Sequence, residues 1–245
     1  ELCERIARQV ERTIKEGMTT SEIYRSAFSL LRKEQGVFAA RYSMRRALLD
    51  MGPTGFPFED YFSELMRARG YETMVRQHIQ GTCTMHEVDV VLKKGDHVIG
   101  AELKFHNVHG FKTDLKTALY VRARFTDIET FAKAQGGKPS VREAWLVTNT
   151  KFTTQAIEYA ECAGIKLLGW GYPATNNLAD LIEETKLYPI TVLTQISRKE
   201  EAQLLARQVT LCRDIAKNPD VLREAGIPRR KHRDIVSESV QLCGA

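Results

Sequence analysis

Two stretches of alternating apolar and polar residues, 85–92 and 97–105, flank the short segment Lys93-Lys94-Gly95-Asp96. Period-two alternation is typical of strands that bury one face, and a glycine-containing break between two such stretches indicates a β-hairpin. Further along, an apolar stretch at 143–148, a helical pattern at 153–163 and a second apolar stretch at 165–169 indicate a strand–helix–strand unit. Buried strands joined by a helix run parallel. The sequence therefore predicts an α/β fold with a mixed sheet flanked by helices.

Helical patterns lie on both sides of this unit. Residues 1–51 predict three helices: Ile6, Val10 and Ile14 share a face of the first, and Thr19 begins the second with N-cap chemistry. After the glycine- and proline-rich break at 52–57, we expect a helix over 58–69, a strand near 73–77 and a long helix over 113–134. Residues from 178 onward are helical again. We therefore divide the chain into regions 1–51, 52–177 and 178–245.

The bulk composition is that of a globular protein with a weak preference for polyanions. The net charge is +5 and the isoelectric point is near 8.9. No apolar run approaches the roughly 20 residues of a membrane helix, and the first residues form an amphipathic pattern, not a secretory signal. The five cysteines are scattered without a CxxC pair, which fits a reducing cytoplasm. Because the chain lacks an initiator Met, we expect a further segment upstream.

The hairpin gathers charged residues on one face. With the turn centred on Lys94-Gly95, Val88 would lie opposite Ala101 and Val90 opposite Ile99. One face would then be apolar, and the other would present four charged side chains, Glu87, Asp89, Glu102 and Lys104. Two carboxylates at this distance repel each other unless a cation lies between them, and a hard divalent ion such as Mg²⁺, with Mn²⁺ as a substitute, is suited to oxygen ligands. Asp89 and Glu102 are thus the candidate metal ligands, and Lys104 would neutralise charge developing on a phosphate.

This arrangement resembles the signature of the PD-(D/E)XK nucleases, in which an Asp is followed across a hairpin by ExK. Here the signature comprises Asp89 and Glu102-Leu103-Lys104, with Val88 in place of the usual Pro. The order of elements over 58–173 resembles the Mrr-like restriction-endonuclease branch. The resemblance implies catalytic roles for Asp89, Glu102 and Lys104, and for Glu59 in the preceding helix. An ExK triplet alone also fits an exposed strand face, and Glu59 also fits a solvated acid in the first turn of a helix.

Other polar residues near the hairpin have two interpretations each. In the Mrr-like branch the helix over 113–134 faces the active site, which makes Tyr120 and Arg124 candidates for phosphate contact; the alternative is an ordinary charged helix surface. His86, His106 and His109 suggest a zinc site, but no fourth ligand is evident.

The flanking regions carry weaker resemblances. Residues 20–24 and 39–42 are similar to the C-terminal half of an ATP-cone, a helical nucleotide-binding module. The strand pair with basic nucleotide contacts is absent from this chain, so binding of ATP or dATP is doubtful, and a helical cap on the nuclease domain is the alternative. Residues 222–236 resemble a degenerate helix-hairpin-helix, which implies contact with a DNA backbone by Arg229, Arg230 and Lys231. The alternative there is a solvated, charged turn.

Together these observations predict a Mg²⁺-dependent endonuclease that hydrolyses DNA phosphodiester bonds, of the restriction or repair type. The alternative is a binding module of the same fold whose catalysis is weak or lost, and the sequence does not distinguish DNA from RNA. Cutting both strands of a duplex with one active site per chain would favour a homodimer.

Overall fold

The structure is a computed structural model that describes residues 2–34, 36–136 and 141–243, with the backbone alone for residues 2, 3, 21, 25, 32–34 and 36–42. Its central element is a five-stranded sheet in the order β1-β2-β3-β5-β7. The strands are β1 (Glu72–Gln80), β2 (Met85–Lys94), β3 (His97–Lys104), β5 (Glu143–Thr148) and β7 (Ile165–Leu168). The first three strands pair antiparallel, whereas β3–β5 and β5–β7 pair parallel. The predicted mixed sheet and parallel crossover are confirmed.

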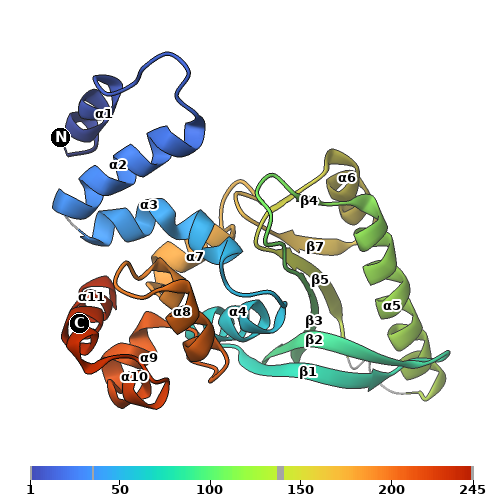
Figure 1. The fold of residues 1–245 in the computed structure, drawn as a ribbon. Coiled ribbons are helices and arrows are strands. Elements are labelled where there is room, and N and C mark those ends of the chain that lie inside the picture. Colours follow the sequence, from blue (N-terminus) through green and yellow to red (C-terminus); the bar gives the residue numbers. More distant parts are fainter. Residues whose placement is uncertain (1, 35, 137–140, 244–245) are drawn as a thin grey trace.

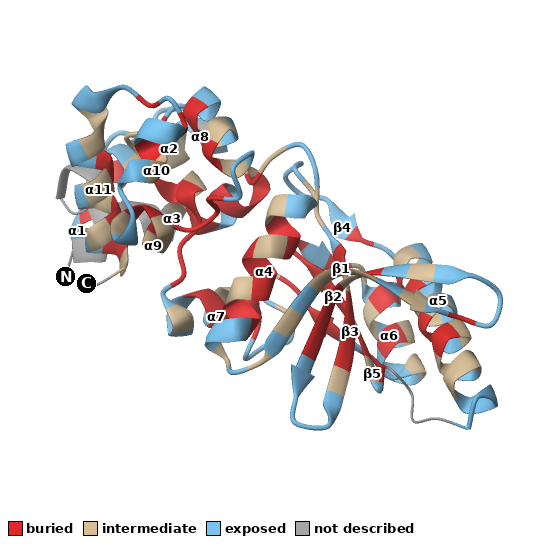
Figure 2. Ribbon diagram, turned by 90° about the horizontal axis from the view of Figure 1, so that it is seen from below, coloured by how far each residue is buried: buried red, intermediate tan, exposed pale blue. Residues whose placement is uncertain are grey.

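Helices cover both faces of this sheet (Figure 1). On one face lies α4 (Phe56–Ala68), and on the other lie α5 (Leu115–Ala134) and α6 (Thr154–Ala163). Figure 2 shows that the buried residues concentrate in the strands and on the helix sides that face them. A two-stranded parallel sheet, β4 (Lys112–Thr113) with β6 (Lys151–Phe152), was not predicted from the sequence. Two expected boundaries move: Asp114 caps α5, so this helix starts after Thr113, and α4 includes Pro57, since proline is tolerated in a first turn.

The hairpin register differs from the predicted one by two residues. Val90 lies opposite Ala101 and Leu92 opposite Ile99, so the turn is formed by Gly95 and Asp96. Gly95 has a φ of +59°, in the left-handed region that tight hairpin turns require. Because a shift of two residues preserves the alternation of side chains, Glu102 still lies on the face that was predicted to be charged.

A second correction concerns Val88, which was expected to share an apolar face with Val90. Val90 packs in the core beneath α4, whereas Val88 packs in the core beneath α5 and α6. The reason lies in the β1–β2 ladder, which is interrupted between Val75–Val90 and Gln77–Val88. At this point Arg76 has a φ of +53°, and the interruption breaks the regular alternation of β2 beside Asp89.

The C-terminal region consists of helices that pack on one another, on α4 and on the N-terminal helix α3 (Gly36–Leu49). These are α7 (Leu178–Thr185), the 3₁₀-helix η1 (Ile190–Val192), α8 (Arg198–Leu205), α9 (Cys212–Lys217), α10 (Asp220–Glu224) and α11 (Arg229–Cys243). The hydroxyl of Tyr61 donates to the Leu187 carbonyl at 2.8 Å, and Arg213 pairs with Glu64 at 2.8 Å. One hydrophobic cluster includes residues of α3, α4, the sheet and α7 to α11. The division of the chain at 51 and 177 remains a prediction, because this cluster crosses both positions.

The N-terminal region contains α1 (Leu2–Glu11), α2 (Thr20–Glu34) and α3 (Gly36–Leu49), as expected. Thr19 and Glu22 exchange hydrogen bonds at the start of α2, which is a capping box. Ile6 and Val10 pack against α2, but Ile14 lies beyond the end of α1 and is exposed, contrary to the predicted face. Several of the ATP-cone-like side chains, those of residues 21 and 39–42, lie outside the described residues. Within the described part of the chain, no helix is long and apolar enough to cross a membrane.

Candidate active site

The candidate site forms where β2 and β3 separate. The last paired residues of these strands are Val90 and Ala101. Asp89, which precedes Val90, and Glu102, which follows Ala101, therefore lie just beyond the end of the ladder. An Asp89 carboxylate oxygen accepts a hydrogen bond from the Leu103 amide at 2.6 Å. The Asp89 side chain thereby provides a hydrogen-bond acceptor for a strand amide beyond the end of the β2–β3 ladder. The same bond fixes the Asp89 carboxylate beside the ExK triplet.

Glu102 lies on the α5 side of the sheet, where Arg124 contacts it. The Arg124 guanidinium pairs with the Glu102 carboxylate, and it also donates to the Glu87 carbonyl at 2.7 Å and to the Tyr120 hydroxyl. Both members of the Glu102–Arg124 pair are largely buried. The Arg124 Nε is buried without a hydrogen-bond partner among the described residues. Arg124, predicted from the sequence, thus lies against the catalytic candidates.

Glu59 reaches the site from the first turn of α4, opposite the α5 side. Its carboxylate pairs with Arg76 of β1 at 3.0 Å, and the same guanidinium pairs with Asp60 at 2.9 Å. Arg76 was not among the residues predicted from the sequence. An arginine in a strand next to a helix that begins with two acids was the available signal, but its role depends on the unusual backbone conformation at this residue.

The three carboxylates carry negative charge that the surrounding protein compensates only in part. Burial raises the pKa of Glu102 from its usual 4.5 to about 7, and repulsion by Asp89 adds to this rise. Burial also raises the pKa of Glu59 to about 7, against the opposing effect of Arg76. The pKa of Asp89 is raised by burial too, although the Leu103 amide opposes the shift. Three acids with raised pKa values in one place form a site whose charge favours a cation.

The donor set fits a hard divalent cation. Mg²⁺ keeps several waters and is usually bound by one or two carboxylates, so Asp89 and Glu102 suffice as protein ligands. Among the described residues, no group of three or more His, Cys, Asp or Glu side chains is arranged to hold a metal. The histidine cluster considered from the sequence is not formed, since His86 pairs with Asp127 at 2.8 Å and His106 with Thr113 at 3.0 Å.

Lys104 follows at the exposed end of β3, two residues after Glu102. The loop behind it is held in place by Asn149, which accepts from the His106 amide at 2.9 Å and donates to the His106 carbonyl at 2.7 Å. Burial and the charge of Lys104 lower the pKa of His106. Asn149 is a second residue that the sequence analysis missed, because its role arises from a contact across 43 residues.

The candidate DNA contacts in the C-terminal region differ from one another. Arg229 and Arg230 are exposed at the start of α11. Lys231 instead pairs with Glu200 of α8, with its Nζ 2.6 and 3.0 Å from the two carboxylate oxygens. Gly226, with a φ of +75°, turns the chain between α10 and α11, so the predicted helix–glycine turn–helix is present.

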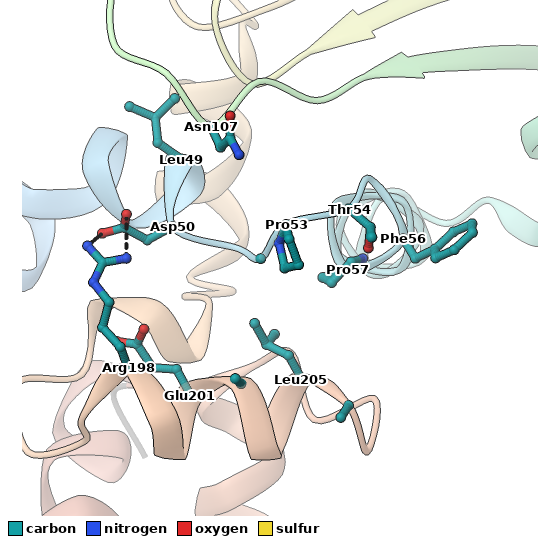
Figure 3. Close-up of a pocket in the computed structure, with 13 residues that line it drawn as sticks. Leu49, Asp50, Pro53, Thr54, Phe56, Pro57, Asn107, Arg198, Glu201 and Leu205 are labelled. Carbon is teal, nitrogen blue, oxygen red and sulfur yellow. Dashed lines mark hydrogen bonds and ion pairs between the residues drawn. The ribbon is translucent and has the colours of Figure 1, made fainter.

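A cavity of about 670 Å³ lies beside the site, between α8, the loop before α4 and Asn107 (Figure 3). The bidentate Asp50–Arg198 pair closes one side, at 3.0 and 3.1 Å. Burial raises the pKa of Glu201 in its wall to about 7. The catalytic candidates do not line this cavity, although Phe56 at the start of α4 does.

Two segments of the chain match described protein families. Residues 51–171 match a family model described as Restriction endonuclease, and residues 188–243 match one described as AF1548-like, C-terminal. An uncharacterized protein of Archaeoglobus fulgidus is 36% identical over 183 residues, which cover 74% of this chain and 99% of that protein. The crystal structure of AF1548, a protein of unknown function, has a TM-score of 0.65 and 34% identity over 78% of this chain and 99% of that one.

Proposed function

Because this chain belongs to the family of the Archaeoglobus fulgidus protein, and its restriction endonuclease match is followed by an AF1548-like, C-terminal match, we propose that it is a Mg²⁺-dependent endonuclease acting on DNA. Its restriction endonuclease domain indicates a nuclease. One observation carries the finer proposal: Glu59, Asp89 and Glu102 converge from α4, β2 and β3, and burial raises all three pKa values, with repulsion by Asp89 adding to the rise at Glu59 and Glu102. Burying carboxylates close together costs folding free energy, and a surface that only binds nucleic acid does not require it.

In this proposal Asp89 and Glu102 hold the cation. The bound ion would supply Lewis acidity toward a phosphate oxygen and toward an attacking water. The Leu103 amide keeps the Asp89 carboxylate oriented. Arg124 compensates Glu102 in the metal-free protein, and a cation held by Glu102 would leave the Arg124 guanidinium available to a phosphate.

Lys104 and Glu59 complete the proposed chemistry. Lys104 provides a positive charge at the open end of β3, where it stabilises the charge that develops on the phosphate. Glu59 is placed to accept a proton or to hold a water from the α4 side, with Arg76 fixing its carboxylate.

We assign DNA contact to exposed or site-facing polar groups. Tyr120 and Arg124 would contact the strand at the scissile phosphate. Arg229 and Arg230 would contact the backbone at a distance, and Lys231 would first have to leave Glu200. A homodimer would give two such sites for cutting both strands.

Plasmid cleavage tests the proposal. Wild-type protein is expected to nick or linearise plasmid with Mg²⁺ or Mn²⁺ but not with EDTA. Asp89→Asn and Lys104→Ala should each lower the rate by about 100-fold or more, as loss of a group that stabilises the transition state does. Lys166→Ala, which removes an exposed lysine on β7, is the matched control and should leave the rate unchanged. Intact plasmid and intact single-stranded DNA with every metal, together with DNA binding, would indicate the non-catalytic binding module instead.

A further inference from the structure

Three aromatic side chains stand out on the surface. Of the aromatic side chains that the structure describes, Phe56, Phe111 and Tyr120 are the exposed ones, each between 54 and 55% exposed. They come from α4, from the loop after β3 and from α5, so no single amphipathic pattern accounts for them. Phe56 and Tyr120 each lie one contact away from a catalytic candidate, and Phe111 stacks on His106, in the loop that follows Lys104.

Phe56 is linked to the site through Arg76. The guanidinium lies over the Phe56 ring, 5.5 Å from its centroid, and the same group pairs with Glu59 at 3.0 Å. Tyr120 is linked through Arg124 in the same way, with the guanidinium 4.6 Å from the ring centroid and paired with Glu102. In each case one face of the ring contacts a cation that is itself anchored on a catalytic candidate.

Phe111 lies in the loop between β3, which ends at Lys104, and β4. Its ring stacks on His106 with the centroids 4.6 Å apart and the planes inclined by 35°. His106 is held by Asn149 through its backbone and by Thr113 through its ring. The loop therefore presents Phe111 from a fixed base.

A hollow of about 630 Å³ extends from Tyr120 along α5. Its walls include Thr82, Ala123 and Thr126, which are small or weakly polar, and Arg124, His86 and Asp127 also line it. The hollow offers space beside an exposed ring and a guanidinium, which is the combination that receives a nucleobase and its phosphate.

Exposed rings beside cations favour one kind of nucleic acid. In a duplex the bases stack on each other, and proteins contact it mainly through phosphates and groove edges. In a single strand each base has a free π-face, and stacking on aromatic side chains contributes strongly to binding. Given the proposed nuclease function, we propose that the preferred substrate is a single-stranded or unpaired segment, whose bases stack on Phe56, Phe111 and Tyr120 while Arg124 and Lys104 contact its backbone.

Binding in EDTA separates this inference from cleavage. Affinity is measured by fluorescence anisotropy for a short labelled single strand and for the same strand in a duplex, and stacking by quenching of 2-aminopurine in the single strand. Phe111→Ala and Tyr120→Ala should each weaken single-strand binding by about 5- to 100-fold, the range expected for loss of one base–aromatic stack. Phe111→Tyr should retain binding and quenching, whereas Phe111→Leu, which keeps the apolar bulk, should lose them. Ile14→Ala, which removes an exposed apolar side chain outside the site, is the control.

Three results would overturn the inference. The first is that the protein binds duplex as tightly as single strands, and the second is that the ring variants bind single strands like the wild type. The third is that these variants change from dimer to monomer without losing affinity, which would make the rings a protein interface. Unfolding midpoints equal to the wild type show that the variants are folded. Cleavage of duplex that requires Lys104, without any preference for single strands, would refute the substrate class and leave the nuclease standing. Single-strand binding that depends on the rings, without cleavage under any metal, would refute the nuclease and leave the single-strand preference standing.

Discussion

Glu102→Gln is expected to make the metal-free protein more stable at alkaline pH. Gln has the shape of the protonated acid and removes the negative charge that Asp89 repels. The pKa of Glu102 rises from its usual 4.5 to about 7 in the folded protein. A difference of one pKa unit between the folded and unfolded states corresponds to about 1.4 kcal/mol of folding free energy. The ionised carboxylate therefore costs roughly 3 kcal/mol of folding free energy at about pH 8. The side chain is only 15% exposed, so solvent screens little of this cost.

The pH dependence gives the prediction its sign. Below pH 4.5 the group is protonated in the folded and unfolded states, so Glu102→Gln and wild type should be equally stable. Between 4.5 and about 7 the unfolded chain releases its proton first, so the wild type loses stability as the pH rises and the Gln variant does not. For a chain of this size the difference at about pH 8 corresponds to a rise of about 6–12 °C in the unfolding midpoint.

The assay is thermal or denaturant unfolding in EDTA at about pH 5 and about pH 8. Glu158→Gln, on the exposed side of α6, is the matched control and should change neither midpoint. A Glu102→Gln variant that is no more stable than wild type at about pH 8, or that gains as much at about pH 5, would refute the reasoning about the buried carboxylates.

Three other predictions concern the metal, the C-terminal region and the sheet. Because Glu102, whose pKa is about 7, must lose its proton to bind a cation, Mg²⁺ should raise the unfolding midpoint more at about pH 8 than at about pH 5.5; an equal rise would contradict this. Arg229→Ala and Arg230→Ala should each weaken DNA binding equally for all sequences and reduce the salt dependence by about one charge, as measured by anisotropy at several salt concentrations. An added Cβ at Gly100 would lie 2.3 Å from the Phe125 ring, so Gly100→Ala should lower the free energy of unfolding by about 1–3 kcal/mol; an unchanged value in denaturant unfolding would show that α5 packs differently.

Most of the fold was predictable because its signals are local. Alternation located β2 and β3, and the apolar stretch at 143–148 has the bounds of β5. The hairpin register was not predictable from alternation, since registers that differ by two residues bury the same faces, and only the turn conformation at Gly95 separates them. The short β4–β6 pair also escaped, because two-residue strands carry no periodicity.

The site was predictable to a lesser extent. Asp89 and Glu102 were identified by residue type and spacing and Glu59 by the family resemblance, and the structure brings the three within electrostatic reach of one another. Arg76 was missed because its pairing with Glu59 depends on a left-handed backbone conformation, which the residue types around it do not indicate. The pairing of Lys231 with Glu200 was missed for a similar reason, since it joins helices whose relative placement depends on the packed core.

The central claim is that Asp89 and Glu102 hold a divalent cation. Crystals of the protein soaked in Mn²⁺ and measured at the manganese absorption edge test it most directly. The account predicts an anomalous peak between these two carboxylates, with Arg124 displaced from Glu102, and no peak there in Asp89→Asn crystals. Manganese bound elsewhere, with the Glu102–Arg124 pair intact, would contradict it.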